Sequence, residues 1–210
     1  MTANGAEVIA LRLSPPVAAF PLQTDWSQSV PVSFAHDWRG EHSYIGRQTE
    51  VRLLWNDEAL FVAFRCLFQT ITVFADADPT GRRDELWERD VAEVFLQPDR
   101  FGEKYYKEFE VSPGGQWLDL DITPQGLRHI TSGMRSRVSI DESRKIWTAE
   151  LAIPFAAVTS RFSPDESWRI NFYRCEGADL DRFYSAWQPT GTEKPNFHVP
   201  EKFGWLRFET

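Results

Sequence analysis

Apolar and polar residues alternate with a period of two along most of this chain, a pattern that favours strands and leaves little room for helices. The runs TEVRLLW (49–55) and ALFVAFRCLF (59–68), joined by the turn NDE, are typical of a hairpin of mostly buried strands. KYYKEFEVSP (104–113), the turn GG and QWLDLDI (116–122) predict a second hairpin. Strand pairing therefore dominates the predicted fold.

The run DVAEVFLQP (90–98) lies between these hairpins and reads as a further strand. One face carries Ala92, Val94 and Leu96, and the other carries Val91, Glu93 and Phe95. Later strands are expected at 136–140, 146–154, 167–175, 182–187 and 203–209. The one convincing helical piece is short, PFAAVTSR (154–161), with proline in its first turn.

Many strands, frequent turn signals and almost no helix predict an all-β fold, an antiparallel β-sandwich of jelly-roll or immunoglobulin-like two-sheet architecture. We expect one domain over 1–210, because all-β domains often reach this length. Its regular core spans 48–208. Residues 1–47 read as an irregular N-terminal part, of which 14–47 is expected to wrap around the sandwich.

The formal charge of −8 and the isoelectric point near 5.1 argue against nucleic acid as a partner, because phosphate binding needs a basic face. Apolar runs fall short of the roughly 18 residues of a membrane span, which argues against a membrane protein. The N-terminal stretch lacks a basic region and is broken by Pro15 and Pro16. We therefore expect a cytoplasmic location unless a leader has been removed.

Cys66 and Cys175 both fall in strand-like runs. Two buried free thiols are one interpretation, and a single disulfide across the sheets, which would imply an oxidising compartment, is the other.

Seven motifs follow one another in a recognisable order. They are TEVRLLWNDEALFVAFRC, LWERDVAEVFLQPD, YYKEFEVSPGGQWLD, WTAELAIPF, WRINFYRCEG, YSAWQPT and NFHVPEKFGWLRF. This order resembles the family 9 carbohydrate-binding modules, a cellulose- and xylan-binding type of β-sandwich, over roughly residues 48–208. The resemblance implies non-catalytic binding of an oligo- or polysaccharide, with any catalytic glycoside hydrolase domain lying elsewhere on a chain.

The resemblance also implies a site in which two tryptophans sandwich a sugar ring and polar groups bind its hydroxyls. The matching tryptophans are Trp87 and Trp187, with Glu93 as a hydroxyl acceptor. Lys107, Gln116 and Arg174 are compatible by strand position. Arg174 also shares a face with Ile170 and Phe172, which favours a buried salt bridge instead. Trp87, set among charges in DELWERD, would thus form one wall of a sugar slot.

An enzyme of the same fold is the main alternative. A glycosidase needs two carboxyl groups about 5–10 Å apart across a sugar. Alternating acids on one strand can meet that distance, and the candidates are Glu108, Glu110, Asp119 and Asp121. The same spacing is also what a solvated strand face shows. A third interpretation places the 14–47 segment in the slot and makes the domain a protein-interaction module.

The resemblance also suggests two groups that the protein could bind, a calcium ion and a haem. A structural calcium is implied as a possibility, with candidate ligands in the pairs Asp76 with Asp78, Asp119 with Asp121, and Asp179 with Asp181. The haem-binding relatives use one methionine and one histidine as axial ligands. Here Met134 would need His129 or His198 as its partner. The four histidines show no zinc spacing.

Overall fold

The protein was analysed as a computed structural model that describes residues 6–13, 20, 25–75, 78, 80–98 and 105–210. Strands dominate this part of the chain, as the alternation predicts. The strands are β1 (Glu7–Arg12), β2 (Val32–Phe34), β3 (Thr49–Trp55), β4 (Ala59–Leu67), β5 (Val91–Pro98), β6 (Tyr106–Val111), β7 (Trp117–Thr123), β8 (Gly126–His129), β9 (Arg135–Asp141), β10 (Ile146–Pro154), β11 (Trp168–Glu176), β12 (Phe183–Ala186) and β13 (Gly204–Glu209). The α-helix in the described part, α1 (Phe155–Val158), is a single turn.

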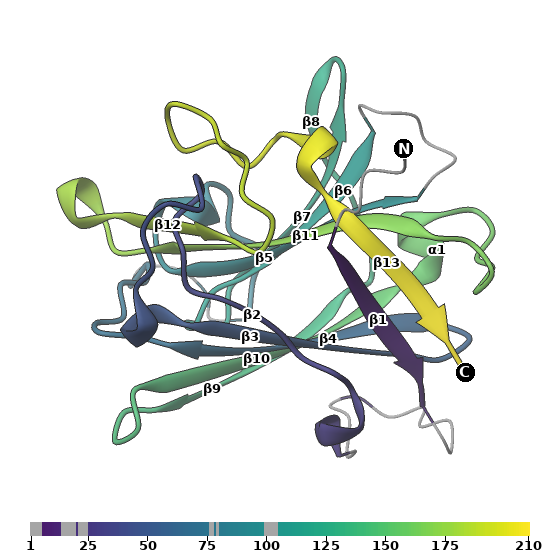
Figure 1. The fold of residues 1–210 in the computed structure, drawn as a ribbon, viewed down its shortest axis with the longest axis horizontal. Coiled ribbons are helices and arrows are strands. Elements are labelled where there is room, and N and C mark those ends of the chain that lie inside the picture. Colours follow the sequence, from purple (N-terminus) through teal and green to yellow (C-terminus); the bar gives the residue numbers. More distant parts are fainter. Residues whose placement is uncertain (1–5, 14–19, 21–24, 76–77, 79, 99–104) are drawn as a thin grey trace.

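The strands form two stacked layers (Figure 1). One layer runs β8-β7-β6-β5-β11, with β12 also paired to β11, and the other runs β3-β4-β10-β9, with β2 paired to β3. Strands β13 and β1 join the layers along one side, so hydrogen bonding runs without a break from one layer into the other. The path remains open, because β8 at one end and β9 at the other do not pair with each other.

Pairing around β1 departs from the antiparallel prediction. Strand β1 is parallel to β13, with Glu7 opposite Trp205, and parallel to β3, with Leu11 opposite Leu54. Both β1 and β2 lie within the N-terminal part that was expected to be irregular. The short alternating run EVIALR carries the strand signal for β1, which a parallel neighbour can complete from a distant part of the chain.

Apolar side chains fill the space between the layers and make an inner core. Edge-to-face contacts such as Phe64 on Phe172, with ring centroids 6.1 Å apart, join the two sheets. Ala92, Val94 and Leu96 point into this core, whereas Val91 and Phe95 point to the opposite face of the sheet. The predicted division of the two faces of β5 is therefore confirmed.

A second group of apolar side chains, the outer cluster, covers the other face of the β7-β6-β5-β11 layer. It consists of Leu86, Val91, Phe95, Tyr106, Leu118, Leu120, Tyr173, Cys175, Ala186, Phe197 and Phe203. This cluster is roofed by two irregular segments, the 3-10 turn η3 (Leu86–Glu88) and residues 195–203. A sheet face covered by irregular segments leaves room for a cavity between them.

Both cysteines are free and buried, so the free-thiol interpretation is confirmed. Among the described residues, none of the helices combines the length and the apolar character that crossing a membrane requires.

Candidate functional site

A cavity of about 250 Å³ opens on the outer face of the β7-β6-β5-β11 layer. The sheet supplies its floor through Glu93 and Phe95 of β5, Glu108 of β6 and Leu120 of β7. Turn η3 forms one wall, and residues 195–198 with Tyr184 of β12 form the other. The cavity thus combines a rigid floor with walls from irregular segments, the usual setting for a binding site.

Trp87 stands at the centre of the first wall, and its side chain is partly buried against the outer cluster. Glu85 precedes the turn with a left-handed backbone conformation, at φ 56°. This conformation sets the direction in which η3 leaves the preceding loop. Arg182 ties the turn to β12, because its guanidinium donates to the Trp87 carbonyl and to Glu88 Oε2 at 2.8 Å. Two elements far apart in the sequence therefore hold Trp87 in place.

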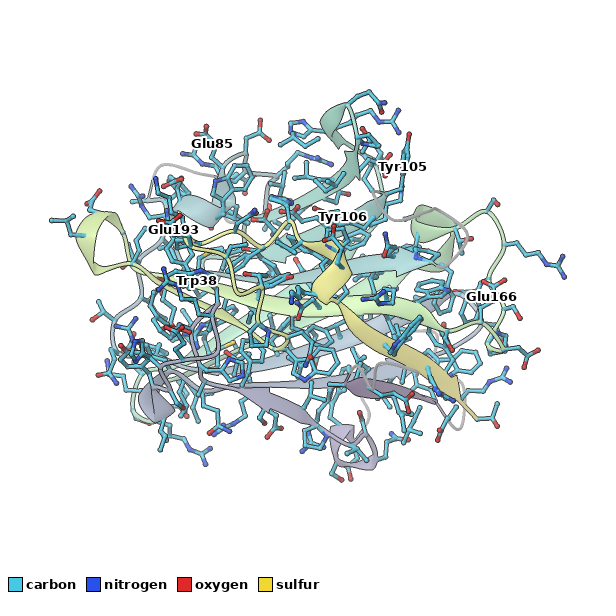
Figure 2. All side chains as sticks on the ribbon, turned by 45° about the horizontal axis from the view of Figure 1, so that its top comes forward. Trp38, Glu85, Tyr105, Tyr106, Glu166 and Glu193 are labelled. Carbon is cyan, nitrogen blue, oxygen red and sulfur yellow. The ribbon has the colours of Figure 1, made fainter. Side chains whose placement is uncertain are left out.

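The second wall is anchored to β11. Tyr173 donates from its hydroxyl to the carbonyl of Phe197 at 3.0 Å, and the two rings stack with centroids 4.2 Å apart. His198 lies on Phe95 at 5.6 Å, and its Nδ1 is hydrogen-bonded to the Tyr106 hydroxyl at 2.6 Å. Figure 2 shows Tyr106 beside the C-terminal segment that carries this wall.

Three glutamates cluster at the floor, and two of them, Glu93 and Glu108, line the cavity. Glu93, Glu108 and Glu110 are 2%, 3% and 0% exposed, and each offers an oxygen within 4.8 Å of the other two. In the register of β5 and β6, Glu93 lies directly opposite Glu110, and Phe95 opposite Glu108. Like charges directly opposite each other destabilise a sheet. A cluster that opposes folding in this way is typical of a functional site.

Burial raises the pKa of all three carboxyl groups. For Glu93 the next cause is the negative charge of Glu108, and for Glu110 it is the charges of Glu93 and Glu108. The same burial raises the pKa of the Cys175 thiol, which lies 3.5 Å from Glu93 Oε1 and donates to it. The cluster therefore binds protons more tightly in the folded chain than in the unfolded one.

This difference predicts that stability falls as pH rises through the folded-state pKa values of the cluster. Carboxyl groups whose pKa is raised by folding favour the folded state fully only below their unfolded value of about 4.3. Glu110→Gln removes one of these groups and supplies an amide that can donate to Glu93 or Glu108. We expect the variant to gain at least about 1.4 kcal/mol at pH 8, the equivalent of one pKa unit.

Thermal unfolding at pH 5 and pH 8 measures this effect, and the gain at pH 8 should exceed the gain at pH 5. Glu142→Gln, in an exposed turn, is the matched control and should change little at either pH. A variant destabilised equally at both pH values would show that Glu110 is ionised and well compensated in the folded chain.

Of the six residues expected at the site, Trp87 and Glu93 line the cavity. Trp187 does not, because its ring lies in the inner core and is 8% exposed. It packs on Phe172 with centroids 5.6 Å apart and fills the space above Gly204. The two tryptophans thus lie in different clusters, on opposite faces of one layer, and the expected two-tryptophan slot is not formed in this structure.

Lys107, Arg174 and Gln116 also lie away from the cavity. Lys107 pairs with Asp121, opposite it in the register of β6 and β7. Arg174 is fully buried and forms a 2.9 Å salt bridge with Glu176, as its strand position favoured. Gln116 lies at the end of the β6–β7 hairpin and donates to the Phe74 carbonyl at 3.4 Å.

The four carboxylates considered for catalysis are divided between the two faces of their sheet. Glu108 and Glu110 share the outer face with Tyr106, whereas Asp119 and Asp121 alternate with the outward residues Leu118 and Leu120 and so point to the other side. Asp119 accepts from Arg82 and Ser132, and Asp121 from Lys107 and Arg128. The two pairs cannot flank one sugar, so the catalytic alternative is not favoured.

The contacts of these carboxylates also bear on the structural calcium that the sequence suggested. Asp119 and Asp121 fit a cation poorly because their oxygens already bind cationic side chains or hydroxyl and amide donors. Asp78 caps its own turn by accepting from Thr80, and its expected partner Asp76 lies outside the described residues. For the pair Asp179 and Asp181, the backbone forms the short turn η5 (Asp179–Asp181).

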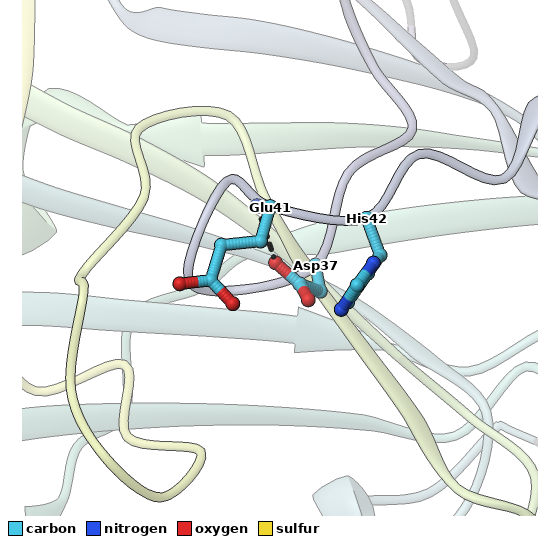
Figure 3. Close-up of side chains that lie close together, drawn as sticks. All are labelled: Asp37, Glu41 and His42. Carbon is cyan, nitrogen blue, oxygen red and sulfur yellow. Dashed lines mark hydrogen bonds between the residues drawn. The ribbon is translucent and has the colours of Figure 1, made fainter.

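A second acidic group lies in the loop before β3, where Asp37, Glu41 and His42 come together (Figure 3). Asp37 Oδ1 accepts from the backbone N–H groups of Arg39 and Glu41, both at 3.0 Å. These bonds close the loop, and they account for the position of the Asp37 carboxylate without a metal ion.

The histidines expected for haem lie apart from Met134. Met134 packs in the inner core, whereas His129 faces Asp84 at 3.2 Å and His198 bonds to Tyr106. Haem ligation by Met134 is therefore not favoured. Within the described part of 14–47, no residue lines the cavity.

Several residues of the cavity were not assigned to the sugar site from the sequence. They are Tyr184, Arg182, Asn196, Phe197 and His198, together with Glu108 as a binding group. The motif NFHVP did carry a signal, since an aromatic ring, an amide and an imidazole lie together in a loop between prolines. Its position opposite Trp87 depends on contacts with β11, which the local pattern does not reveal.

A β-sandwich with an aromatic- and carboxyl-lined cavity on one sheet belongs to the class of ligand-binding domains. Carbohydrate-binding family 9 matches residues 31–208. The chain belongs to this family, whose members bind carbohydrates and are not catalytic.

The chain is also similar to individual proteins. An "Extracellular protein" of Arthroderma benhamiae is 26% identical over 179 residues, which cover 77% of this chain and 78% of that protein. A solved structure from Bacteroides uniformis superposes with a TM-score of 0.77 at 18% identity, over 98% of this chain and 100% of the other. A family 9 module of Caldicellulosiruptor kristjanssonii in complex with cellotriose has a TM-score of 0.67 at 13% identity, over 97% and 94% of the two chains.

Proposed function

We propose that this domain binds a saccharide in the cavity between Trp87 and residues 195–198. The observation that carries the proposal is the combination of an aromatic wall, Trp87, with a floor of buried carboxyl groups in one cavity. The C–H groups on the face of a pyranose can lie on the indole ring without losing hydrogen bonds, while its hydroxyls donate to Glu93 and Glu108.

The size of the cavity limits how much of a saccharide it takes. Pockets for drug-sized ligands measure roughly 300–1,000 Å³, so about 250 Å³ suits one or two sugar rings. A second hollow lies on the other side of Trp87 and Leu127, bounded by Asp84, Glu85 and His129. A longer chain would therefore continue past Trp87 along the surface. Cellotriose and glucose, found in complexes of a family relative, are the ligands to test first.

Replacing the aromatic wall should weaken binding. Stacking on an aromatic ring contributes roughly 1–3 kcal/mol for a nucleobase, and a sugar face at the lower end of this range gives about a fivefold to tenfold effect. We expect Trp87→Ala to weaken cellotriose binding at least fivefold, as measured by calorimetry and by tryptophan fluorescence. Trp205→Ala, which removes a partly exposed indole outside the cavity, is the matched control and should bind as the wild type does.

The variant Trp187→Phe distinguishes binding in the proposed cavity from binding in a slot between two tryptophans. Because the Trp187 ring is buried against Phe172, the variant should retain cellotriose binding while losing some stability. Full binding by Trp87→Ala together with lost binding by a folded Trp187→Phe would refute the proposed cavity and restore Trp187 to the site.

A further inference from the structure

We propose that the saccharide bound in this cavity carries a protonated amine, as a 2-amino sugar does, with its ammonium group placed over Glu93 and Glu108. This inference rests on the proposed saccharide binding and names the class of sugar. It starts from the charges that the cavity presents.

Carboxylates outnumber cations in the cavity. Glu88, Glu93 and Glu108 line it, and Arg182 is the one guanidinium among its described lining residues. Arg182 is already engaged, since it donates to Glu88 Oε2 at 2.8 Å and to the Trp87 carbonyl. A bound cation would therefore meet carboxyl groups that have no cationic partner of their own and that could ionise beside it.

The carboxyl oxygens of the floor lack donors. Among the described residues, the one basic group within 4.0 Å of the three glutamates is His198, whose Nδ1 lies 4.0 Å from Glu108 Oε2 and is already bonded to Tyr106. Within the described part of the chain, Glu108 Oε2 and both carboxyl oxygens of Glu110 are buried and accept from no amide, hydroxyl or cationic group, although a proton can be shared between the two carboxyl groups. Buried carboxyl groups without partners oppose folding strongly, so they are retained where a ligand completes them.

An ammonium group supplies what the floor lacks. It carries one positive charge and three N–H donors, whereas a sugar hydroxyl carries one donor and no charge. Hydrogen bonds between an ammonium and a carboxylate are roughly twice as strong as neutral ones. The indole of Trp87 and the phenol of Tyr184 at the sides of the cavity also favour a cation, because aromatic faces attract positive charge.

A divalent metal ion fits this floor less well than an ammonium. Calcium takes six to eight oxygen ligands, and the two glutamates that line the cavity offer four oxygens at most. One of these carboxyl groups, Glu93, already accepts from the Cys175 thiol. An amine needs fewer acceptors and remains attached to a sugar ring that the aromatic wall can hold.

The test compares three disaccharides of the same size and linkage: cellobiose, the fully deacetylated 2-amino disaccharide, and its N-acetylated form. Calorimetry at pH 6.5 should give at least tenfold tighter binding for the amino disaccharide than for either neutral one. The titrations are repeated at 0.5 M salt, because general attraction of a cation to a chain of charge −8 is screened there.

Glu108→Gln tests the assignment to the floor, and Glu93→Gln is the second variant. Each should reduce the ratio of amino to neutral disaccharide affinity at least tenfold, while Glu142→Gln, in an exposed turn, should keep the wild-type ratio. Equal affinity of the wild type for cellobiose and the amino disaccharide would overturn the inference and leave the proposed function intact. No binding of any of the three would count against the proposed function itself. An amine preference that both floor variants retain, or that added calcium abolishes, would also overturn the inference.

Discussion

Arg174→Met should destabilise the domain by about 3–5 kcal/mol, the loss typical of breaking a buried salt bridge by removing one partner. Arg174 is fully buried, and its guanidinium donates to Glu176 Oε1 at 2.9 Å and to the Leu67 carbonyl at 2.6 Å. It thus ties β11 in one layer to the end of β4 in the other. Methionine preserves much of the volume but leaves Glu176 and this carbonyl without a donor.

The loss should depend on pH. Burial raises the pKa of Glu176 to about 7 even though the Arg174 charge opposes the shift. Without Arg174 the Glu176 pKa rises further, and the folded variant must protonate this carboxyl group. Stability contributed by a raised pKa is present at low pH and is lost as pH rises through the folded value. The loss of stability caused by Arg174→Met should therefore be smaller at pH 5 than at pH 8.

Thermal unfolding measures both effects. For a chain of this length, 3–5 kcal/mol corresponds to a decrease in Tm of roughly 6–20 °C. The double variant Arg174→Met with Glu176→Gln should recover part of the loss, because no buried charge remains. Arg12→Met, which breaks the exposed pair with Asp57, should change stability by less than about 1 kcal/mol. An Arg174→Met protein as stable as this control would show that the buried pair contributes nothing.

Gly204→Ala should destabilise by about 2–3 kcal/mol through overpacking. A Cβ atom at this position would lie 2.5 Å from Trp187 Cζ3 and 2.7 Å from the Ala6 carbonyl oxygen. Both neighbours are held in place, since Trp187 packs on Phe172 and the Ala6 carbonyl accepts from the Trp205 N–H at 2.9 Å. One added methyl group must therefore shift either the inner core or the start of β13.

A double-mutant cycle with Trp187→Leu isolates the clash with the ring. Because leucine leaves space above residue 204, the two substitutions together should destabilise less than the sum of their separate effects. Gly191→Ala is the control for adding a methyl group where nothing lies within 4 Å, although its φ of +68° brings its own cost. Strict additivity in the cycle would contradict the packing of Trp187 against Gly204, and with it the burial of this tryptophan.

The layered strand architecture was predictable because alternation is a local signal. The runs at 49–55 and 146–154 match β3 and β10 in both bounds. Strand β8 (Gly126–His129) was not predicted, because all four of its residues are exposed and give no alternation to read. The parallel pairs of β1 were not predictable either, since register between the two ends of a chain leaves no mark in either segment.

The candidate site was predictable to a smaller degree. Trp87 and Glu93 follow from the family resemblance, and both line the cavity. The position of Trp187 depends on the way the chain turns after β12, which sends its ring into the inner core. The glutamate cluster depends on the register that sets Glu93 opposite Glu110, although the alternation did show that these acids share strand faces.

The position of β1 also sets the order in which the sandwich forms during synthesis. Its residues are synthesised before the other described strands, but Glu7 to Ala10 pair with β13, the last of these strands. Until residue 209 has emerged, only Leu11 and Arg12 have their partners on β3. The pairing of β1 with β13 that joins the layers therefore forms after translation of the domain. Its partners lie nearly two hundred residues apart in the sequence, and contacts of such long range slow folding. Until then Glu7 to Ala10 of β1 lack their strand partner and are open to pairing with other chains.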